Sequence, residues 1–251
     1  MKIHTPLFIV VFLGAFCLTN LSHAQAQADA IFAKANADYA AKHFPEAVKG
    51  YESLVKDGHW SASVFYDLGN AYFRTEDFGR AILNYERALA LQPSQPEAEA
   101  NLRFVRDQAR ALELAPNWAE EHLGFLTTNQ YAWLAATTFW GAIFIFAGLC
   151  FARRRAVVWI FAMLLLCAIG AGSTYAIVAF EGGSGGRDLA IVTKEKIQAR
   201  LATAENAGTV LILPPGSEVK ILGTRGAWSY TALPNDLRGW IPASSAERVR
   251  L

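Results

Sequence analysis

Two long stretches without a charged residue constrain this chain more than any other feature. They cover residues 131–152 and 156–180, and only three arginines, Arg153 to Arg155, stand between them. A helix rises about 1.5 Å per residue, so each stretch is long enough to cross the hydrocarbon core of a bilayer. Arginines in a short connecting loop are typical of the cytoplasmic side. The sequence therefore predicts two transmembrane helices, with the regions before and after them on the same exterior face.

The first 24 residues (1–24) have the pattern of a secretory signal peptide. Lys2 precedes an apolar segment over 7–18, and Ser22-His23-Ala24 provides small residues at the positions that a signal peptidase reads. We predict cleavage after Ala24. The alternative is an uncleaved membrane anchor, which the short apolar segment disfavours. Export of the region that follows agrees with the orientation that the arginine loop predicts.

Composition and motifs argue against several classes of function. The 251-residue chain has a formal net charge of +1, which does not point to nucleic acid. Its three cysteines all lie in apolar stretches, so neither a disulfide framework nor a cysteine-based zinc site is expected outside them. The two long apolar stretches hold no ionisable residue of the kind that an ion or proton pathway needs. Because HExxH, GxSxG and P-loop motifs are also absent from the sequence, we predict a protein that is not an enzyme and has no metal or cofactor.

Residues 28–95 repeat themselves with a period of 34. The paired positions include Asn36 and Asn70, Phe44 and Phe78, Ala47 and Ala81, and Tyr51 and Tyr85. The period and these residue types resemble the tetratricopeptide repeat (TPR). The resemblance implies an all-α domain over 25–115, with repeats at about 28–61 and 62–95 and a capping helix at about 97–112. Two helices are expected to cross closely at Gly69 and Ala81.

TPR domains bind peptides or protein segments in a concave groove, so the resemblance implies protein partners. The residues that it places at or near groove-facing positions are Asn36, Tyr66, Asn70 and Phe73. Carboxylate-binding members also use Lys or Arg at three further positions, which are uncharged here: Phe32, Ala100 and Phe104. The alternatives are that the two asparagines bond to neighbouring backbone and that Phe73 is buried between the repeats. Residues 25–130 carry 15 acidic and 10 basic residues, which favours a basic or mixed partner surface.

Residues 187–251 have the pattern of a small all-β domain. A Gly/Ser segment at 182–186, predicted as a flexible linker, precedes six short β-rich runs at 190–192, 197–201, 209–213, 218–222, 228–233 and 239–241. The motifs Leu213-Pro214-Pro215-Gly216-Ser217, Gly226-Ala227-Trp228 and Gly239-Trp240-Ile241-Pro242 resemble those of bacterial SH3-type domains. The resemblance implies a barrel with a ligand-binding groove formed by Trp228, Tyr230, Trp240 and Pro242. The alternative is that the tryptophans fill the core of the barrel.

The order of these parts resembles the BatE-like family, the E-type proteins of the bacterial aerotolerance (Bat) operon. That resemblance implies a scaffold in the bacterial inner (plasma) membrane that assembles with von Willebrand A-domain proteins. Both soluble domains would lie on the periplasmic face. The alternative function is a module that binds or senses peptidoglycan through the SH3-type domain. The expected architecture therefore combines an all-α TPR domain, two transmembrane helices and a C-terminal all-β SH3-like barrel.

Overall fold

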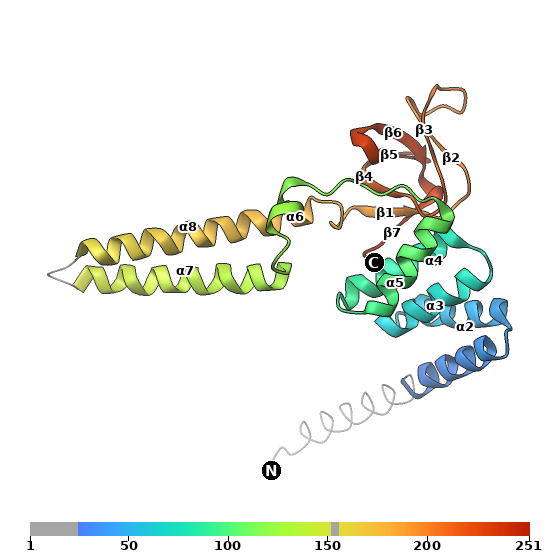
Figure 1. The fold of residues 1–251 in the computed structure, drawn as a ribbon, viewed down its shortest axis with the longest axis horizontal. Coiled ribbons are helices and arrows are strands. Elements are labelled where there is room, and N and C mark those ends of the chain that lie inside the picture. The colour runs from blue at the N-terminus through green and yellow to red at the C-terminus, as the bar shows by residue number, and fades with distance from the viewer. Residues whose placement is uncertain (1–24, 152–155) are drawn as a thin grey trace, which may run out of the picture.

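The computed structural model describes residues 25–151 and 156–251 (Figure 1). The predicted signal peptide and the arginines at 153–155 lie outside these residues. Figure 1 shows a group of short helices, two long helices that run side by side, and a sheet that lies against the short helices. The chain passes through these three parts in that order. After the two long helices, the chain therefore comes back to the short helices and forms the sheet beside them.

The short helices form the predicted helical repeat. They are the described part of a helix over 25–40, then α2 (Phe44–Lys56), α3 (Ala62–Arg74), α4 (Phe78–Leu91) and α5 (Pro96–Ala109). Capping groups determine where several of them begin: the Ser61 side chain accepts a hydrogen bond from the Val64 amide, and Pro96 stands in the first turn of α5. α5 is shorter than the predicted 97–112, because Arg110 takes a left-handed conformation (φ 53°) that ends the helix.

Small residues let the two helices of a repeat approach closely. A Cβ atom at Gly69 would lie 2.8 Å from the ring of Tyr85 and 3.3 Å from the carbonyl oxygen of Ala81, which is itself fully buried. In the first repeat, a Cβ atom at Gly50 would lie 2.8 Å from that of Ala35. The close crossing predicted at Gly69 and Ala81 is therefore present.

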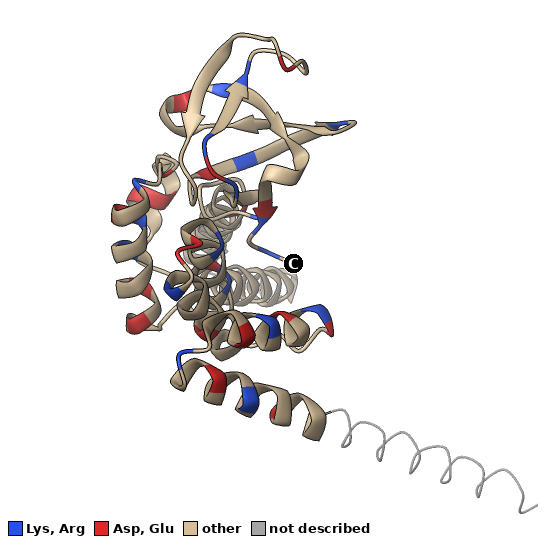
Figure 2. Ribbon diagram, turned by 90° about the vertical axis from the view of Figure 1, so that its right-hand side faces the viewer, with Lys and Arg blue, Asp and Glu red and all other residues tan. Residues whose placement is uncertain are grey.

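Two helices of the described residues are long and apolar enough to cross a membrane: α7 (Thr128–Phe151) and α8 (Ala156–Glu181). Their bounds lie within a few residues of the predicted 131–152 and 156–180. They pack side by side through small residues, since a Cβ atom at Gly170 would lie only 2.9 Å from Oγ1 of Thr138. α7 holds no charged residue and α8 holds only Glu181, at its end, whereas Figure 2 shows charged residues spread over the repeat and the sheet.

The C-terminal part is an antiparallel sheet in the strand order β3-β2-β6-β5-β4-β1-β7. The strands are β1 (Leu189–Val192), β2 (Ile197–Arg200), β3 (Thr209–Leu213), β4 (Glu218–Arg225), β5 (Trp228–Ala232), β6 (Arg238–Pro242) and β7 (Ala246–Arg248). Six of them overlap the predicted β-rich runs, and β7 was not predicted. A buried cluster that includes Val192, Leu213 and Ile241 forms the core of this sheet.

The glycine-rich segment at 182–186 differs from the flexible linker expected, because a short helix, α6 (Trp118–Leu123), holds it in place. Oε1 of Glu120 accepts hydrogen bonds from the Ser184 hydroxyl (3.1 Å) and the Gly185 amide (3.2 Å). The side chain of Asn117 donates a hydrogen bond to the Ala179 carbonyl at 2.8 Å. These bonds join the segment before α7 to the last turn of α8 and the segment that follows it.

The repeat and the sheet share one hydrophobic core. Leu189 and Ile191 of β1, together with Val249, belong to the same buried cluster as Ile82 and Leu83 of α4. The backbones of α4 and the end of β1 also meet, since a Cβ atom at Gly79 would lie 2.9 Å from the carbonyl oxygens of Val192 and of Thr193, the residue after β1. The repeat and the sheet, which the sequence predicts as separate domains, are therefore packed against each other.

Candidate functional site

Each repeat holds its asparagine with one tyrosine hydroxyl. Tyr51 donates a hydrogen bond to Oδ1 of Asn36 at 2.6 Å, and Tyr85 donates one to Oδ1 of Asn70 at 2.7 Å. Burial raises the pKa of both tyrosines, so their hydroxyls remain neutral donors. The alternative expectation was that these asparagines bond to neighbouring backbone. It is wrong, because their partners are tyrosine side chains. The bond is instead a repeated contact between side chains on the two helices of a repeat.

Asn70 is also part of a second amide contact, which the sequence analysis missed. Nδ2 of Asn101, on α5, donates hydrogen bonds to Oδ1 of Asn70 (3.0 Å) and to the hydroxyl of Tyr66 (3.3 Å). The ring of Tyr66 lies 6.0 Å from that of Tyr85. Tyr66 is thus held in position while it stays half-buried. The 34-residue period gives no signal for Asn101, because it aligns this residue with Asp67 and aligns Asn36 and Asn70 with Phe104.

Phenylalanines continue this surface along α3 and α5. Phe73 is partly buried and packs against the core of the repeat, so the alternative that it is buried between the repeats holds in part. Its ring lies 5.8 Å from that of Phe104, which is 60% exposed. Neighbouring Asp67 is desolvated by burial, which raises its pKa to about 6. We define the aromatic–amide surface as Tyr66, Asn70, Phe73, Asn101 and Phe104.

The four residues predicted on the sheet lie together on one face. Tyr230 is directly opposite Trp240 in the β5–β6 pairing, and Trp228 is directly opposite Pro242. The rings of Tyr230 and Trp240 lie 5.0 Å apart. All four side chains are half-buried, whereas the alternating residues Ser229, Thr231 and Ile241 are buried. The tryptophans therefore do not form the buried core of the sheet. Beside Trp228 and Pro242 lies a depression of about 510 Å³ that Arg200 also lines.

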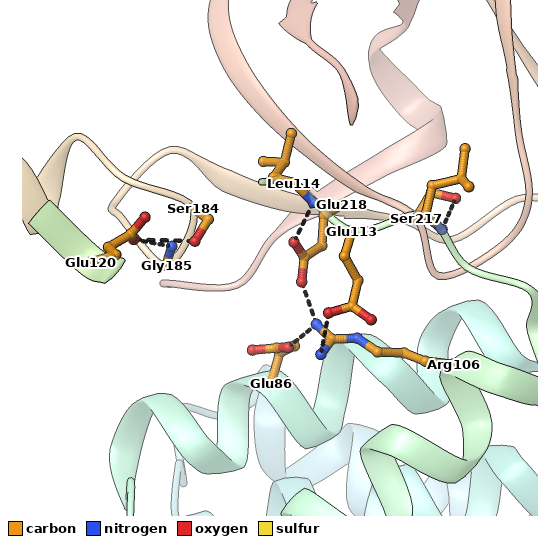
Figure 3. A network of polar contacts seen from close by, with 10 residues as sticks. Glu86, Arg106, Glu113, Leu114, Glu120, Ser184, Gly185, Ser217 and Glu218 are labelled. Carbon is orange, nitrogen blue, oxygen red and sulfur yellow. Dashed lines mark hydrogen bonds and ion pairs between the residues drawn. The ribbon is translucent and has the colours of Figure 1, made fainter. Parts of the chain in front are cut away.

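A network of charged residues joins the repeat to the sheet (Figure 3). Arg106 of α5 forms ion pairs with Glu86 of α4 (2.5 Å), with Glu113 (3.4 Å) and with Glu218 of β4. Glu218 also accepts a hydrogen bond from the Leu114 amide at 2.9 Å. Burial raises the pKa of Glu218 to about 7 and also raises that of Glu86, although Arg106 opposes both shifts.

The segment 111–114 reinforces this junction with backbone bonds. The Leu112 amide donates to the Ser217 hydroxyl at 3.1 Å, and the Glu218 amide donates to the Leu112 carbonyl at 2.8 Å. No local signal in the sequence indicates this network, because its members come from segments that are far apart in the chain. Among residues 25–151 and 156–251, no three His, Cys, Asp or Glu side chains are placed to hold a metal ion.

The comparisons with known proteins agree with the helical repeat. Residues 62–95 match the family model of the tetratricopeptide repeat. The match covers the second repeat, from the start of α3 to just beyond α4. A search of curated proteins finds no match to the chain. The TPR is a non-catalytic interaction module, and its presence here supports a scaffold for protein–protein interaction.

Proposed function

We propose that this protein is a non-enzymatic, membrane-anchored scaffold that binds protein partners through its repeat, in a Bat-type complex with von Willebrand A-domain proteins. The observation that carries the proposal is the aromatic–amide surface. Its amides and the Tyr66 hydroxyl are held by internal hydrogen bonds, which lowers the entropy lost on binding. Its exposed ring, Phe104, is of the kind that anchors protein interfaces.

The sharpest test is Phe104→Ala in the full chain, purified from membranes in mild detergent. Phe104 is mostly exposed, so its removal should leave the melting temperature unchanged. Co-purification of von Willebrand A-domain proteins should fall at least tenfold. Leu91→Ala removes a similarly exposed apolar side chain from α4 and serves as the matched control. If Phe104→Ala and the double variant Tyr66→Ala, Asn70→Ala fold normally and retain these partners, this surface is not the recognition site.

The contact between repeat and sheet supports the proposed orientation in the membrane. Because the two parts share a core, they belong on the same side of any membrane that α7 and α8 cross. The proposal that this side is the periplasm depends on the signal peptide and the arginine loop. Reporter fusions at Ala115 and Leu251 should both read periplasmic, and a fusion at Arg154 should read cytoplasmic. Opposite readings at Ala115 and Leu251 would contradict the two-span arrangement.

A second candidate function depends on the sheet, which we propose to be an SH3-type barrel that binds peptidoglycan. The half-buried face of Trp228, Tyr230, Trp240 and Pro242 favours it, since paired aromatic rings at a surface are suited to ligand contact. The test is retention of the detergent-solubilised full chain on purified peptidoglycan. Trp240→Ala should abolish retention, and Phe104→Ala should not alter it. Absence of retention for the unaltered chain would exclude this function.

A further inference from the structure

The sheet and the repeat carry charge of opposite sign. Residues 187–251 hold nine basic and six acidic residues, so their net charge is +3. Residues 25–130, with 15 acidic and 10 basic residues, have a net charge of −5. Charge complementarity therefore favours an acidic partner for the sheet, the opposite of what it favours for the repeat.

The strand register places three arginines on the face of the sheet that carries the half-buried aromatic rings. Residues directly opposite each other in an antiparallel pair present their side chains on the same face. Arg200 of β2 is opposite Trp240, and Arg225 of β4 is opposite Trp228. Arg238 of β6 lies two residues before Trp240, so alternation places it on this face too. We define the basic–aromatic face as Arg200, Arg225, Arg238, Trp228, Tyr230 and Trp240.

The arginines of this face are not neutralised by the chain itself. Within residues 25–151 and 156–251, none of the three forms an ion pair with a carboxylate. Arg225 and Arg238 are exposed, and Arg200 is half-buried. A ligand that brings carboxylates can therefore reach positive charge that has no counter-charge in the fold.

The depressions at the two ends of this face have the same charge balance. The depression of about 510 Å³ is lined by Lys196 and Arg200 against one carboxylate, that of Glu205. A second depression, of about 230 Å³, is lined by Lys220 and Arg238 against the carboxylate of Asp236. Lys220 and Arg238 belong to this face as well, because both are opposite Ala232. At each end, two cations thus stand against one carboxylate.

Arg200 is held in position by the loop between β2 and β3. Its Nη1 donates hydrogen bonds to the carbonyl oxygen of Glu205 and, at 3.2 Å, to that of Ala207. A guanidinium carries five N–H donors, and in the described part of the chain those at Nε and Nη2 are left for a ligand. Such a group can donate two parallel hydrogen bonds to a carboxylate, and it loses little freedom because it is already oriented.

The combination of arginines and rings specifies the chemistry of the ligand. A basic segment would meet like charge on this face, and a neutral glycan would leave the arginines without a partner. A peptide with several carboxylates can pair with the arginines while its methylene groups pack on the rings. We propose that the basic–aromatic face binds an acidic segment, rich in Asp or Glu, that a protein partner presents.

This inference rests on the proposed scaffold function, to which it adds a second binding surface, but its test needs no partner protein. The probe is a fluorescein-labelled peptide in which Glu and Ala alternate, added to the full chain in micelles of a neutral detergent. The readout is fluorescence anisotropy. The matched peptide with Gln in place of every Glu should bind at least tenfold more weakly. Binding of the acidic peptide should also weaken at least tenfold between about 50 mM and about 500 mM NaCl, since salt screens exposed charges.

Three variants separate binding from folding. Arg200→Gln removes the oriented guanidinium and should weaken the acidic peptide at least fivefold. The double variant Arg225→Gln, Arg238→Gln changes two exposed side chains, so it should weaken the peptide similarly with an unchanged melting temperature. Arg103→Gln is the matched control, because Arg103 is an exposed arginine of α5 that donates to a backbone carbonyl, as Arg200 does. This variant should bind the acidic peptide normally.

Four results would overturn the inference. They are equal binding of the Glu and Gln peptides, unchanged binding in both arginine variants of the sheet, tighter binding of chitotriose than of the acidic peptide, and loss of the peptide from micelles that contain phosphatidylglycerol. The third would assign the face to glycan, and the fourth would assign its arginines to anionic lipid.

Failure of the scaffold proposal gives a different pattern. There, the acidic peptide still binds, while Phe104→Ala leaves partner association unchanged. Absence of peptide binding alongside an intact, Phe104-dependent complex would overturn this inference alone.

Discussion

Arg106 of α5 and Glu218 of β4 form an ion pair between the repeat and the sheet, although 112 residues and both apolar helices separate them in the chain. Both side chains are largely buried, with 13% and 9% of their surface exposed. Glu86 shares the same guanidinium, so Arg106 offsets two carboxylates at the junction. The repeat and the sheet therefore form a single packed unit, and the two apolar helices α7 and α8 are inserted between them in the chain.

The first prediction concerns the removal of this shared cation. Arg106→Met keeps much of the apolar volume but leaves the buried carboxylates of Glu86 and Glu218 without a counter-charge. Breaking a buried pair in this way typically costs about 3–5 kcal/mol, so the melting temperature of the full chain should fall clearly. Lys34→Ala breaks an exposed pair with Asp38 and should cost less than about 1 kcal/mol. Equal effects of the two variants would show that the buried network does not stabilise the junction.

The second prediction concerns pH. Burial raises the pKa of Glu218 to about 7 from 4.5 and that of Asp67 to about 6 from 3.8, so the folded state binds more protons than the unfolded state between these values. The free energy of unfolding should therefore fall as pH rises from about 4.5 to about 7, by at most about 1.4 kcal/mol per pH unit for each such group. Urea unfolding at a series of pH values measures this slope.

Glu218→Gln is the matched variant for the pH experiment. The amide keeps the shape of the side chain and does not titrate, so the slope should become smaller and retain only the part that comes from Asp67 and Glu86. A free energy of unfolding that rises over this pH range would mean that the attraction of Arg106 for the carboxylate outweighs burial.

Much of the fold could be predicted because its signals are local in the sequence. The 34-residue period indicates the pairs Tyr51–Tyr85 and Asn36–Asn70, and the structure joins each tyrosine to its asparagine by the same hydrogen bond. Uncharged length alone indicates α7 and α8. Alternation in β5 places Trp228 and Tyr230 on one face, where the structure has them.

The rest depends on contacts between distant segments, which carry no local signal. Nothing near Arg106 in the sequence indicates that Glu218 is its partner. β7 has only three residues, and two of them are exposed, so it shows no apolar alternation. The glycine-rich segment at 182–186 has the composition of a flexible linker, but Glu120 reaches it from 64 residues away. Composition indicates how a segment behaves alone and not what packs against it.

The third prediction tests the close helix crossing in the second repeat. Ala81 is fully buried on α4 and faces Gly69 of α3 across the crossing. Ala81→Leu would overpack the crossing and should lower the free energy of unfolding by about 1–3 kcal/mol, since Tyr85 is tied to Asn70 and has little freedom to move aside. Ala90→Leu, at an exposed position of the same helix, is the control and should change stability little. An unchanged melting temperature for Ala81→Leu would contradict the helix register.

The last prediction tests the contact that ties the two ends of the apolar hairpin together. Glu120 accepts hydrogen bonds from Ser184 and Gly185 through Oε1 and from the Asn117 amide through Oε2. Glu120→Ala removes all three, so amide hydrogen exchange over 182–186 should become at least tenfold faster, while the buried strands keep their protection. Glu121→Ala is the control, because its side chain is exposed and lies next in the sequence.

A second variant approaches the same contact from the glycine side. Gly183 is buried against the Glu120 carboxylate with no room for a side chain, so Gly183→Ala should displace that carboxylate and speed exchange in the same segment. The effects of the two changes on the exchange rate should not add in the double variant, since either change alone breaks the contact. Additive effects, or exchange that stays slow in Glu120→Ala, would mean that the turn is held by its own backbone. In that case α6 would not couple the segment before α7 to the sheet that follows α8.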